Sequence, residues 1–127
     1  MTVRVLVVDD ESDVELLFRQ QFRRELRDGR FDLAFAHSGD EALQKIHSED
    51  ESNLVLSDIN MPGMSGLDLL PRIKSEHPTL PVLMITAYGD ANTRRVAFER
   101  GADGLLTKPI DFAALRQKIE TRLGMVA

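Results

Sequence analysis

The 127-residue sequence contains no cysteine, no tryptophan and a single tyrosine. The missing cysteine excludes disulfide bonds, thiolate nucleophiles and cysteine-ligated metal sites. No apolar run approaches the roughly 20 residues that a membrane-spanning helix needs, and acidic residues directly follow the first such run, unlike in a secretory signal peptide. Basic residues are the minority charge, because 16 Lys and Arg face 21 Asp and Glu and leave a formal net charge of -5.

This composition indicates one intracellular domain. Hydrophobic residues make up 43% of the chain, which is enough for a core, and 127 residues is an ordinary length for one domain. The net negative charge does not favour binding to nucleic acid or to an anionic membrane surface. We therefore expect a single cytoplasmic domain over residues 1–127 with no direct nucleic-acid or membrane partner.

Strand-like and helix-like segments alternate along the chain. Short apolar runs predict five strands, at residues 3–8, 31–36, 54–57, 81–86 and 104–107. Helical spacing predicts five helices, within residues 9–29, 38–46, 65–77, 90–101 and 111–124. Ser38 and Asp90 are the predicted N-terminal caps of the second and fourth helices. Alternation with short connections favours right-handed crossovers, so the sequence predicts an α/β fold with a doubly wound, five-stranded parallel sheet and five helices.

Four of the predicted strands end beside residues that could carry chemistry. Asp9 and Asp10 follow the first strand, Asp58 the third, Thr86 ends the fourth, and Lys108 follows the fifth. In such sheets, ligands bind beyond the carboxyl ends of the strands. Carboxylates this close are costly to ionise together, and a divalent cation relieves that cost. Mg²⁺ suits an all-oxygen site, and we expect it here.

The same residues match the requirements of phosphoryl transfer. Charge develops on the equatorial oxygens of the phosphoryl group, where a metal ion, the Lys108 ammonium and the Thr86 hydroxyl can each stabilise it. Asp58 is then the nucleophile, and it forms an acyl phosphate.

The segments VVDDE, LSDINMPGMSGLDLL, MITAYGD and GADGLLTKPID resemble the receiver (CheY-like) domain of two-component response regulators over essentially the whole chain. The resemblance implies a flavodoxin-like sheet in the order 2-1-3-4-5. It also implies that Asp58 is the phosphoacceptor and that Thr86 and Lys108 contact the phosphoryl group. A cis peptide bond between Lys108 and Pro109 is a further implied feature.

The resemblance further implies a metal site and signalling partners. Mg²⁺ would be held by Asp9, Asp10, Asp58 and the backbone carbonyl of Asn60. The phosphoryl group would come from a sensor histidine kinase or a histidine phosphotransfer protein, and a downstream target protein would bind the face made by the fourth helix, fifth strand and fifth helix. The chain would be a stand-alone switch that catalyses only its own phosphorylation and slow dephosphorylation, and not a metabolic enzyme.

Other functions of related folds fit the sequence less well. A flavin-binding domain needs a Ser/Thr-rich phosphate loop after the first strand, where this chain has the acidic segment DDES. The P-loop motif GxxxxGK[ST] is absent. A haloacid-dehalogenase-type phosphatase carries its nucleophile on the first strand in a DxD motif, which VVDDE does not match. The remaining alternative is a pseudo-receiver, an interaction module of the same fold that acts without phosphorylation.

Departures from the commonest receiver pattern concern the switch and not the phosphorylation chemistry. The position three before the lysine usually carries Phe or Tyr, and here it is Leu105. Tyr88, two residues after Thr86, is expected at the mouth of the site as a substitute for that ring. Pro71, inside the third helix, removes a backbone hydrogen bond and should bend or weaken the helix. Residues 94–95, both arginine, lie on the fourth helix of the expected output face.

Overall fold

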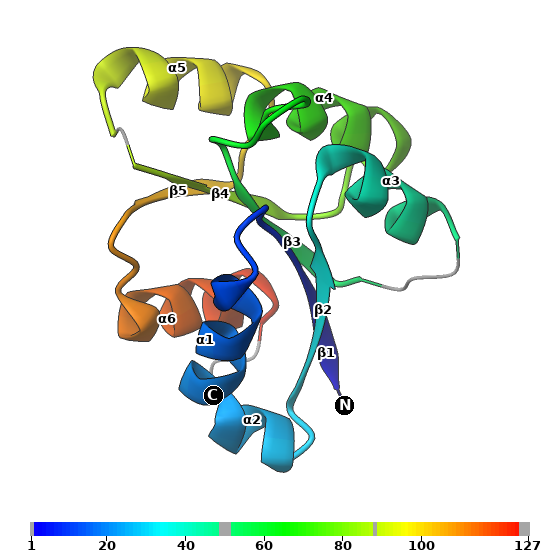
Figure 1. Cartoon of the computed structure of the whole chain (residues 1–127), viewed down its shortest axis with the longest axis vertical. Helices are drawn as coiled ribbons and strands as arrows, with labels where there is room; N and C mark the ends of the chain where they lie inside the picture. The colour runs from blue at the N-terminus through cyan, green and yellow to red at the C-terminus, as the bar shows by residue number, and fades with distance from the viewer. Residues whose placement is uncertain (1, 49–51, 88, 125–127) are drawn as a thin grey trace.

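Five parallel strands form the central sheet in the order β2-β1-β3-β4-β5, which confirms the predicted order (Figure 1). The computed structural model describes residues 2–48, 52–87 and 89–124. The strands are β1 Val3–Val8, β2 Phe31–Ala36, β3 Leu54–Asp58, β4 Val82–Thr86 and β5 Gly104–Thr107. They are rich in β-branched residues and leucine and are buried almost throughout, as a sheet covered on both faces requires.

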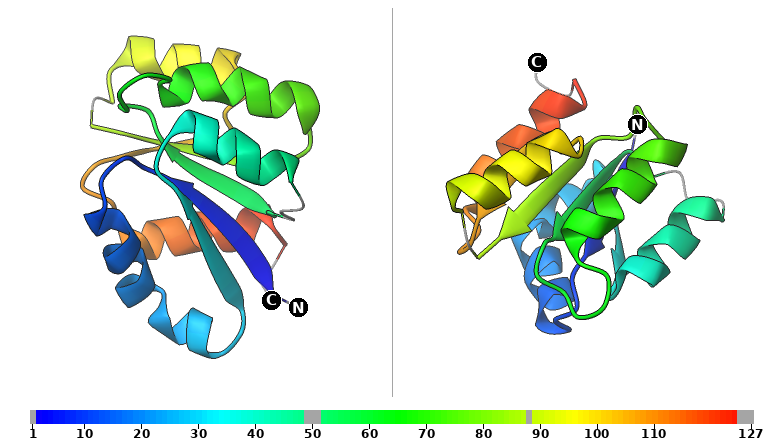
Figure 2. Two further views of the ribbon diagram at one scale, coloured as in Figure 1. Left: turned by 45° about the vertical axis from the view of Figure 1, so that its right-hand side comes forward. Right: turned by 90° about the horizontal axis from the view of Figure 1, so that it is seen from above.

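Helices cover both faces of the sheet (Figures 1 and 2). They are α1 Asp13–Gln21, α2 Arg23–Arg27, α3 Gly39–His47, α4 Gly66–Glu76, α5 Ala91–Glu99 and α6 Phe112–Arg122. One face carries α1 and α6, and the other carries α3, α4 and α5. Alternation along β1 supplies both cores, because Val5 and Val7 pack with the first set of helices and Leu6 and Val8 with the second. No helix in the described ranges is long and apolar enough to cross a lipid bilayer.

The first predicted helix is two helices, so the described residues contain six helices where the sequence predicted five. The break falls at Phe22, whose backbone (φ -108°, ψ 17°) leaves the helical region. Its ring is buried and lies 5.6 Å from the ring of Phe31 and 6.0 Å from that of Phe112. The Gln21 carbonyl beside the break accepts a hydrogen bond from Arg116 Nη2 at 2.9 Å. Tertiary packing therefore overrides a continuous helical pattern.

The predicted helix caps are confirmed, and α4 continues through its proline. Ser38 Oγ accepts from Glu41 N at 3.1 Å, and Asp90 Oδ1 accepts from Thr93 N at 2.7 Å. Helix α4 runs unbroken from Gly66 to Glu76 with Pro71 inside it. The proline lacks the backbone donor of a regular helix, and the predicted bending or weakening of α4 stays a prediction.

Candidate functional site

Three carboxylates lie together at the edge formed by the carboxyl ends of the strands. Single carboxylate oxygens of Asp9, Asp10 and Asp58 all lie within 4.8 Å of one another. The pairing of β1 with β3 brings them together, because Val8 lies opposite Ser57. Asp9 and Asp10 directly follow Val8, and Asp58 directly follows Ser57. Asp58 is only 2% exposed and Asp9 is 7% exposed, whereas Asp10 is open to solvent. The structure thus assembles the predicted acidic cluster.

Lys108 supplies the positive charge of the cluster. Its Nζ donates to Asp58 Oδ2 at 3.1 Å. Burial alone would lower the pKa of Lys108, but the hydrogen bond and charge of Asp58, with the charges of Asp9 and Glu11, outweigh that effect and raise it. The Lys108 ammonium is therefore held in its charged form beside Asp58.

The surroundings of Asp9 favour its neutral form. Burial raises the pKa of Asp9, the nearby charge of Asp58 raises it further, and the hydrogen bond from Glu11 N and the charge of Lys108 lower it only in part. Ionising Asp9 next to Asp58 is therefore costly. Such a cluster of oxygen ligands, with more acids than bases, fits a hard divalent cation.

Thr86 and Asn60 complete the surroundings of Asp58. Thr86 ends β4, is 1% exposed, and has its Oγ1 3.5 Å from Asn60 Oδ1. Asn60 N donates to Asp58 Oδ1 at 3.2 Å, so both oxygens of this carboxylate accept hydrogen bonds. The role of the Asn60 carbonyl as a metal ligand stays a prediction.

The loop after β3 approaches Asp58 closely, which only glycine permits. A Cβ on Gly66 would lie 2.2 Å from the carbonyl oxygen of Asp58 and 2.8 Å from Cα of Ile59. Gly66 N donates to the Ile59 carbonyl at 2.9 Å. The first turn of α4 therefore rests on the backbone that presents the carboxylate.

Two further observations concern the strand ends. The Lys108–Pro109 bond is cis, as predicted. His37, which the sequence analysis did not single out, lies beside the cluster with its Nδ1 3.3 Å from the Asp9 carbonyl. The signal that could have found it is the pairing of β1 with β2, because His37 follows Ala36, the partner of Val8.

The structure describes only one of the two residues, Leu105 and Tyr88, at which the sequence departs from the usual switch. Leu105 is buried, 9% exposed, among the side chains of the core that β1 shares with α3 and α4. It is packed in the interior and not displayed on the surface. Tyr88 lies outside the described residues, so its place at the mouth of the site stays a prediction.

Known proteins of similar sequence are response regulators. Residues 5–120 match the family model described as the response regulator receiver domain. The chain is 41% identical over 107 residues to the DNA-binding transcriptional regulator NtrC of Proteus hauseri, covering 84% of the chain and 22% of that protein. It is 38% identical over 120 residues to the response regulator protein PilR of Pseudomonas aeruginosa (94% and 26%), and 36% identical over 123 residues to the response regulator MprA of Mycobacterium ulcerans (97% and 51%). The chain thus spans between about a fifth and a half of these relatives.

Solved structures agree on the fold. A CheY-like receiver domain protein from Methanospirillum hungatei superposes with a TM-score of 0.87 at 29% identity, covering 98% of this chain and 96% of that one. The response regulator TrrA of Thermotoga maritima, solved in complex with Mg²⁺ and BeF, superposes at 0.80 with 31% identity, covering 95% and 99%. Fold and site together define a CheY-like α/β signalling domain. This chain belongs to the response regulator receiver domain family of two-component systems.

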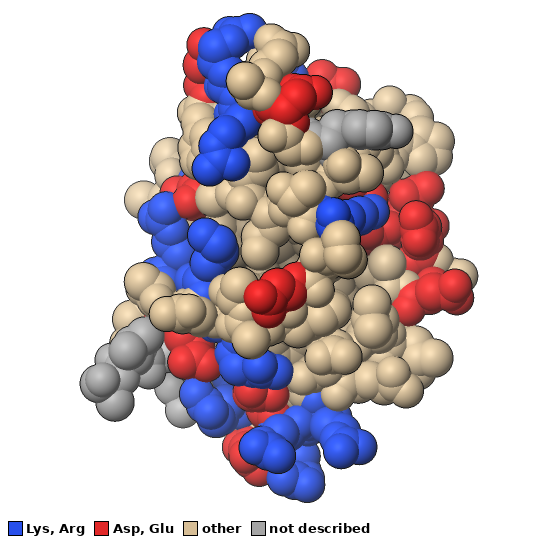
Figure 3. Space-filling model, turned by 90° about the vertical axis from the view of Figure 1, so that its left-hand side faces the viewer, with Lys and Arg blue, Asp and Glu red and all other residues tan. Residues whose placement is uncertain are grey.

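The expectation of no nucleic-acid partner is not supported by these relatives. NtrC is named as a DNA-binding regulator, and this chain matches 22% of it. The net charge of -5 also conceals local segregation of charge. Figure 3 shows basic side chains gathered at the lower end of one face, and the exposed arginines of α1 and α2 are Arg19, Arg23, Arg24 and Arg27. Net charge alone therefore says little about what this end of the domain contacts.

Proposed function

We propose that this receiver domain accepts a phosphoryl group on Asp58 from a phosphohistidine donor and that phosphorylation switches its binding to other proteins. One observation carries the proposal. A carboxylate that is 2% exposed sits within 3.1 Å of the Lys108 ammonium and beside two further carboxylates. An aspartate in a merely structural ion pair does not need Asp9 and Asp10 next to it, because they raise the cost of its charge.

The chemistry is a transfer between two nucleophiles. An Asp58 oxygen forms a bond to phosphorus while the bond between phosphorus and the imidazole nitrogen of the donor breaks, and the donor histidine keeps that electron pair. Asp58 must be ionised to attack, and the Lys108 ammonium stabilises this form. Thr86 ends β4, which pairs with the strand of Asp58, and Lys108 follows β5, which pairs with β4. The Thr86 hydroxyl and the Lys108 ammonium would contact the transferred phosphoryl oxygens.

Mg²⁺ would be held by Asp9, Asp10, Asp58 and the carbonyl of Asn60. The fit rests on the three carboxylate oxygens that lie within 4.8 Å of one another. When bound, the ion would neutralise part of the charge that develops on the phosphoryl oxygens. Hydrolysis of the acyl phosphate by water would return the domain to its starting state, so the protein would catalyse only its own phosphorylation and slow dephosphorylation.

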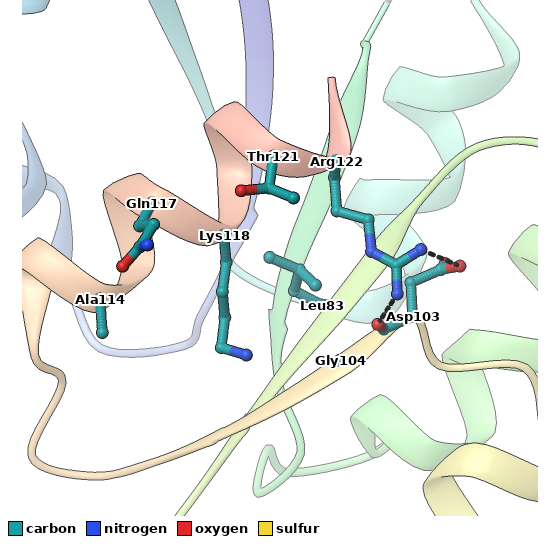
Figure 4. A pocket seen from close by; sticks show the side chains of 8 residues that line it. All are labelled: Leu83, Asp103, Gly104, Ala114, Gln117, Lys118, Thr121 and Arg122. Carbon is teal, nitrogen blue, oxygen red and sulfur yellow. Dashed lines mark hydrogen bonds and ion pairs between the residues drawn. The ribbon is translucent and has the colours of Figure 1, made fainter. Parts of the chain in front are cut away.

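The proposed partners follow the same assignment. A sensor histidine kinase or histidine phosphotransfer protein would donate the phosphoryl group. A downstream target would bind the face made by α5, β5 and α6, which are the fourth predicted helix, the fifth strand and the fifth predicted helix. Between the start of β5 and α6 is a hollow of about 360 Å³ (Figure 4). Lys118 of α6 extends into it, and Arg122 crosses to Asp103.

The direct test is incubation with acetyl phosphate and Mg²⁺ followed by intact-mass measurement. We expect one added phosphoryl group on the wild-type chain and none on Asp58→Asn, because an amide is a poor nucleophile toward phosphorus. Asp28→Asn is the matched control, since Asp28 is exposed and precedes β2 at the amino-terminal edge of the parallel sheet, opposite the site, and should leave incorporation unchanged. Failure of the wild-type chain to gain mass would favour the pseudo-receiver alternative, and gain by Asp58→Asn would refute the assignment of the phosphoacceptor.

A further inference from the structure

The proline inside α4 leaves one backbone carbonyl without its helical partner. In a regular helix the N–H of residue 71 would donate to the carbonyl of Leu67, four residues earlier, and Pro71 has no N–H. Arg100 supplies the missing donor, because its Nη1 donates to the Leu67 carbonyl at 2.7 Å. The same nitrogen lies 3.4 Å from Asp68 Oδ1. Since Arg100 directly follows α5 as its C-terminal cap residue, the contact joins the end of α5 to the first turn of α4.

A second contact fastens the same segment. Lys74 of α4 donates from Nζ to Asp103 Oδ2 and to the Leu80 carbonyl, each at 2.8 Å. Between the two contacts, Gly101 has φ +104°, and a Cβ there would lie 3.3 Å from Cγ of Lys74. Arg122 also reaches Asp103 from α6 (Figure 4). Residues 100–103 are therefore fixed to the body of the domain.

The N-terminal end of α5 has no comparable attachment among the described residues. Ala97 is the one buried side chain of the helix and lies in its second half. The interactions that the structure shows for Arg95 stay within the helix, with Asn92 and Glu99. The loop that enters α5 runs beside the site, because a Cβ on Gly89 would lie 2.9 Å from Thr107 Oγ1, next to Lys108.

We propose that Arg100 is a positioning residue that fixes the C-terminal end of α5 to α4, so that α5 turns about this end when the residues around Thr86 respond to phosphorylation. The proposal rests on the proposed function for the cause of the turn, but the fastening itself is a property of the unmodified protein. A turn about residue 100 would move the opposite end of α5 most. The exposed Arg94 would then change position relative to β5, while the segment of residues 100–103 would stay in place.

A double-mutant cycle tests the fastening without phosphorylation. Pro71→Ala restores an N–H that can bond the Leu67 carbonyl, so Arg100 should matter less in that background. We expect Arg100→Gln to lower the folding equilibrium constant about tenfold in the wild-type background and less than about threefold in the Pro71→Ala background, because only the first change leaves the carbonyl unpaired. Equal losses in both backgrounds, or no loss in the wild-type background, would overturn the proposal.

Two variants separate fastening from general effects on the helix. Arg100→Lys keeps a donor at this position and should recover most of the loss seen with Arg100→Gln. Arg95→Gln removes an exposed arginine of α5 whose partners, Asn92 and Glu99, belong to the same helix. It should change the folding equilibrium constant by less than about twofold. A loss from Arg95→Gln as large as that from Arg100→Gln would refute a specific role for Arg100.

Amide chemical shifts with and without beryllofluoride and Mg²⁺ test the turn. In the wild-type protein we expect large shifts in residues 91–95 and small ones in residues 100–103, and in Arg100→Gln the large shifts should spread to residues 100–103. Equal shifts at both ends of the wild-type helix would overturn the pivot. Absence of shifts even near Asp58 would defeat the proposed function and with it the turn, and the cycle would still decide the fastening separately.

Discussion

Asp58 combines burial with negative charge, two properties that oppose each other unless the charge has partners. Its two oxygens accept hydrogen bonds from Asn60 N and Lys108 Nζ, and these bonds offset part of the cost of removing the carboxylate from water. The carboxylates of Asp9 and Asp10 lie close to that of Asp58 and raise the cost of its negative charge. At the scale of single residues, therefore, the site is built to hold one ionised carboxylate comfortably and to favour a cation that compensates the other two.

Magnesium binding should stabilise the fold through this cluster. At ten times its dissociation constant, the ion should raise the free energy of unfolding by about 1.4 kcal/mol if the unfolded chain binds none. Asp10→Ala should abolish this gain, whereas Asp40→Ala, an exposed acid of α3 outside the cluster, should keep it. Urea unfolding with and without Mg²⁺ measures both. An Asp10→Ala protein with an undiminished gain would show that the ion binds elsewhere.

The raised pKa of Asp9 predicts a dependence of stability on pH in the absence of metal. Because burial first, and the charge of Asp58 next, raise this pKa above its ordinary value of 3.8, the folded state holds the proton more tightly than the unfolded state does. The contribution of Asp9 to stability is therefore present below pH 3.8 and is lost as pH rises through the folded-state pKa. Asp9→Asn should remove this loss and raise the free energy of unfolding at pH 7. Urea unfolding of both proteins at several pH values measures this difference. Equal free energies of unfolding for the wild-type and Asp9→Asn proteins at pH 7 would contradict the prediction.

At the scale of elements, short backbone contacts position the site as much as side chains do. Helix α4 begins where Gly66 touches the Asp58 backbone, and α3 begins where Gly39 meets the side chain of Met64. The first contact is with backbone atoms that cannot move without displacing β3. The second is with the side chain of Met64, whose sulfur and Cγ can move to another rotamer, while its Cβ, 3.1 Å from the added Cβ, needs only a small shift.

This contrast predicts unequal effects from two similar substitutions. Gly66→Ala places a Cβ 2.2 Å from the Asp58 carbonyl, so a shift of the loop is unavoidable, and the loss of unfolding free energy should be about 2 kcal/mol or more. Gly39→Ala introduces a Cβ 2.7 Å from Met64 Sδ at the same first position of a helix, and the loss should stay below about 1 kcal/mol. Denaturant unfolding of both variants measures these two losses of free energy. Equal losses would mean that the approach of α4 to Asp58 is not tight.

At the scale of the whole molecule, the site and the expected output face are linked through β4 and β5. Thr86 ends β4 at the site, and the chain then enters α5 on the output face. Leu105 cannot act as the usual aromatic reporter, because it is smaller than a ring, has no hydroxyl group and is already buried in the core, at 9% exposure. We therefore expect a signal from Thr86 to travel along the loop into α5, and this loop carries the only tyrosine of the chain, Tyr88.

Tyr88→Ala tests whether this tyrosine substitutes for the missing ring. We expect beryllofluoride to shift amide resonances from residue 88 to residue 100 in the wild-type protein and to shift them much less in Tyr88→Ala. Ala87→Gly, a change at the neighbouring exposed position, is the control for loosening of the loop. Shifts confined to the neighbours of Asp58 would instead indicate two states that differ little, between which a partner selects.

The sequence by itself determined the alternation of strands and helices, the parallel sheet and the residues that meet at its edge. These follow from local periodicity and from the rule that parallel strands end on the same side, so Asp9, Asp58 and Lys108 could be placed together without coordinates. Only the tertiary structure decided where distant segments meet. The helix broke at Phe22, beside a carbonyl bonded by an arginine 95 residues away, and the carbonyl freed by Pro71 found its donor 33 residues away. Periodicity encodes which face of a segment is buried, but the partner of an unpaired polar group depends on how whole elements pack.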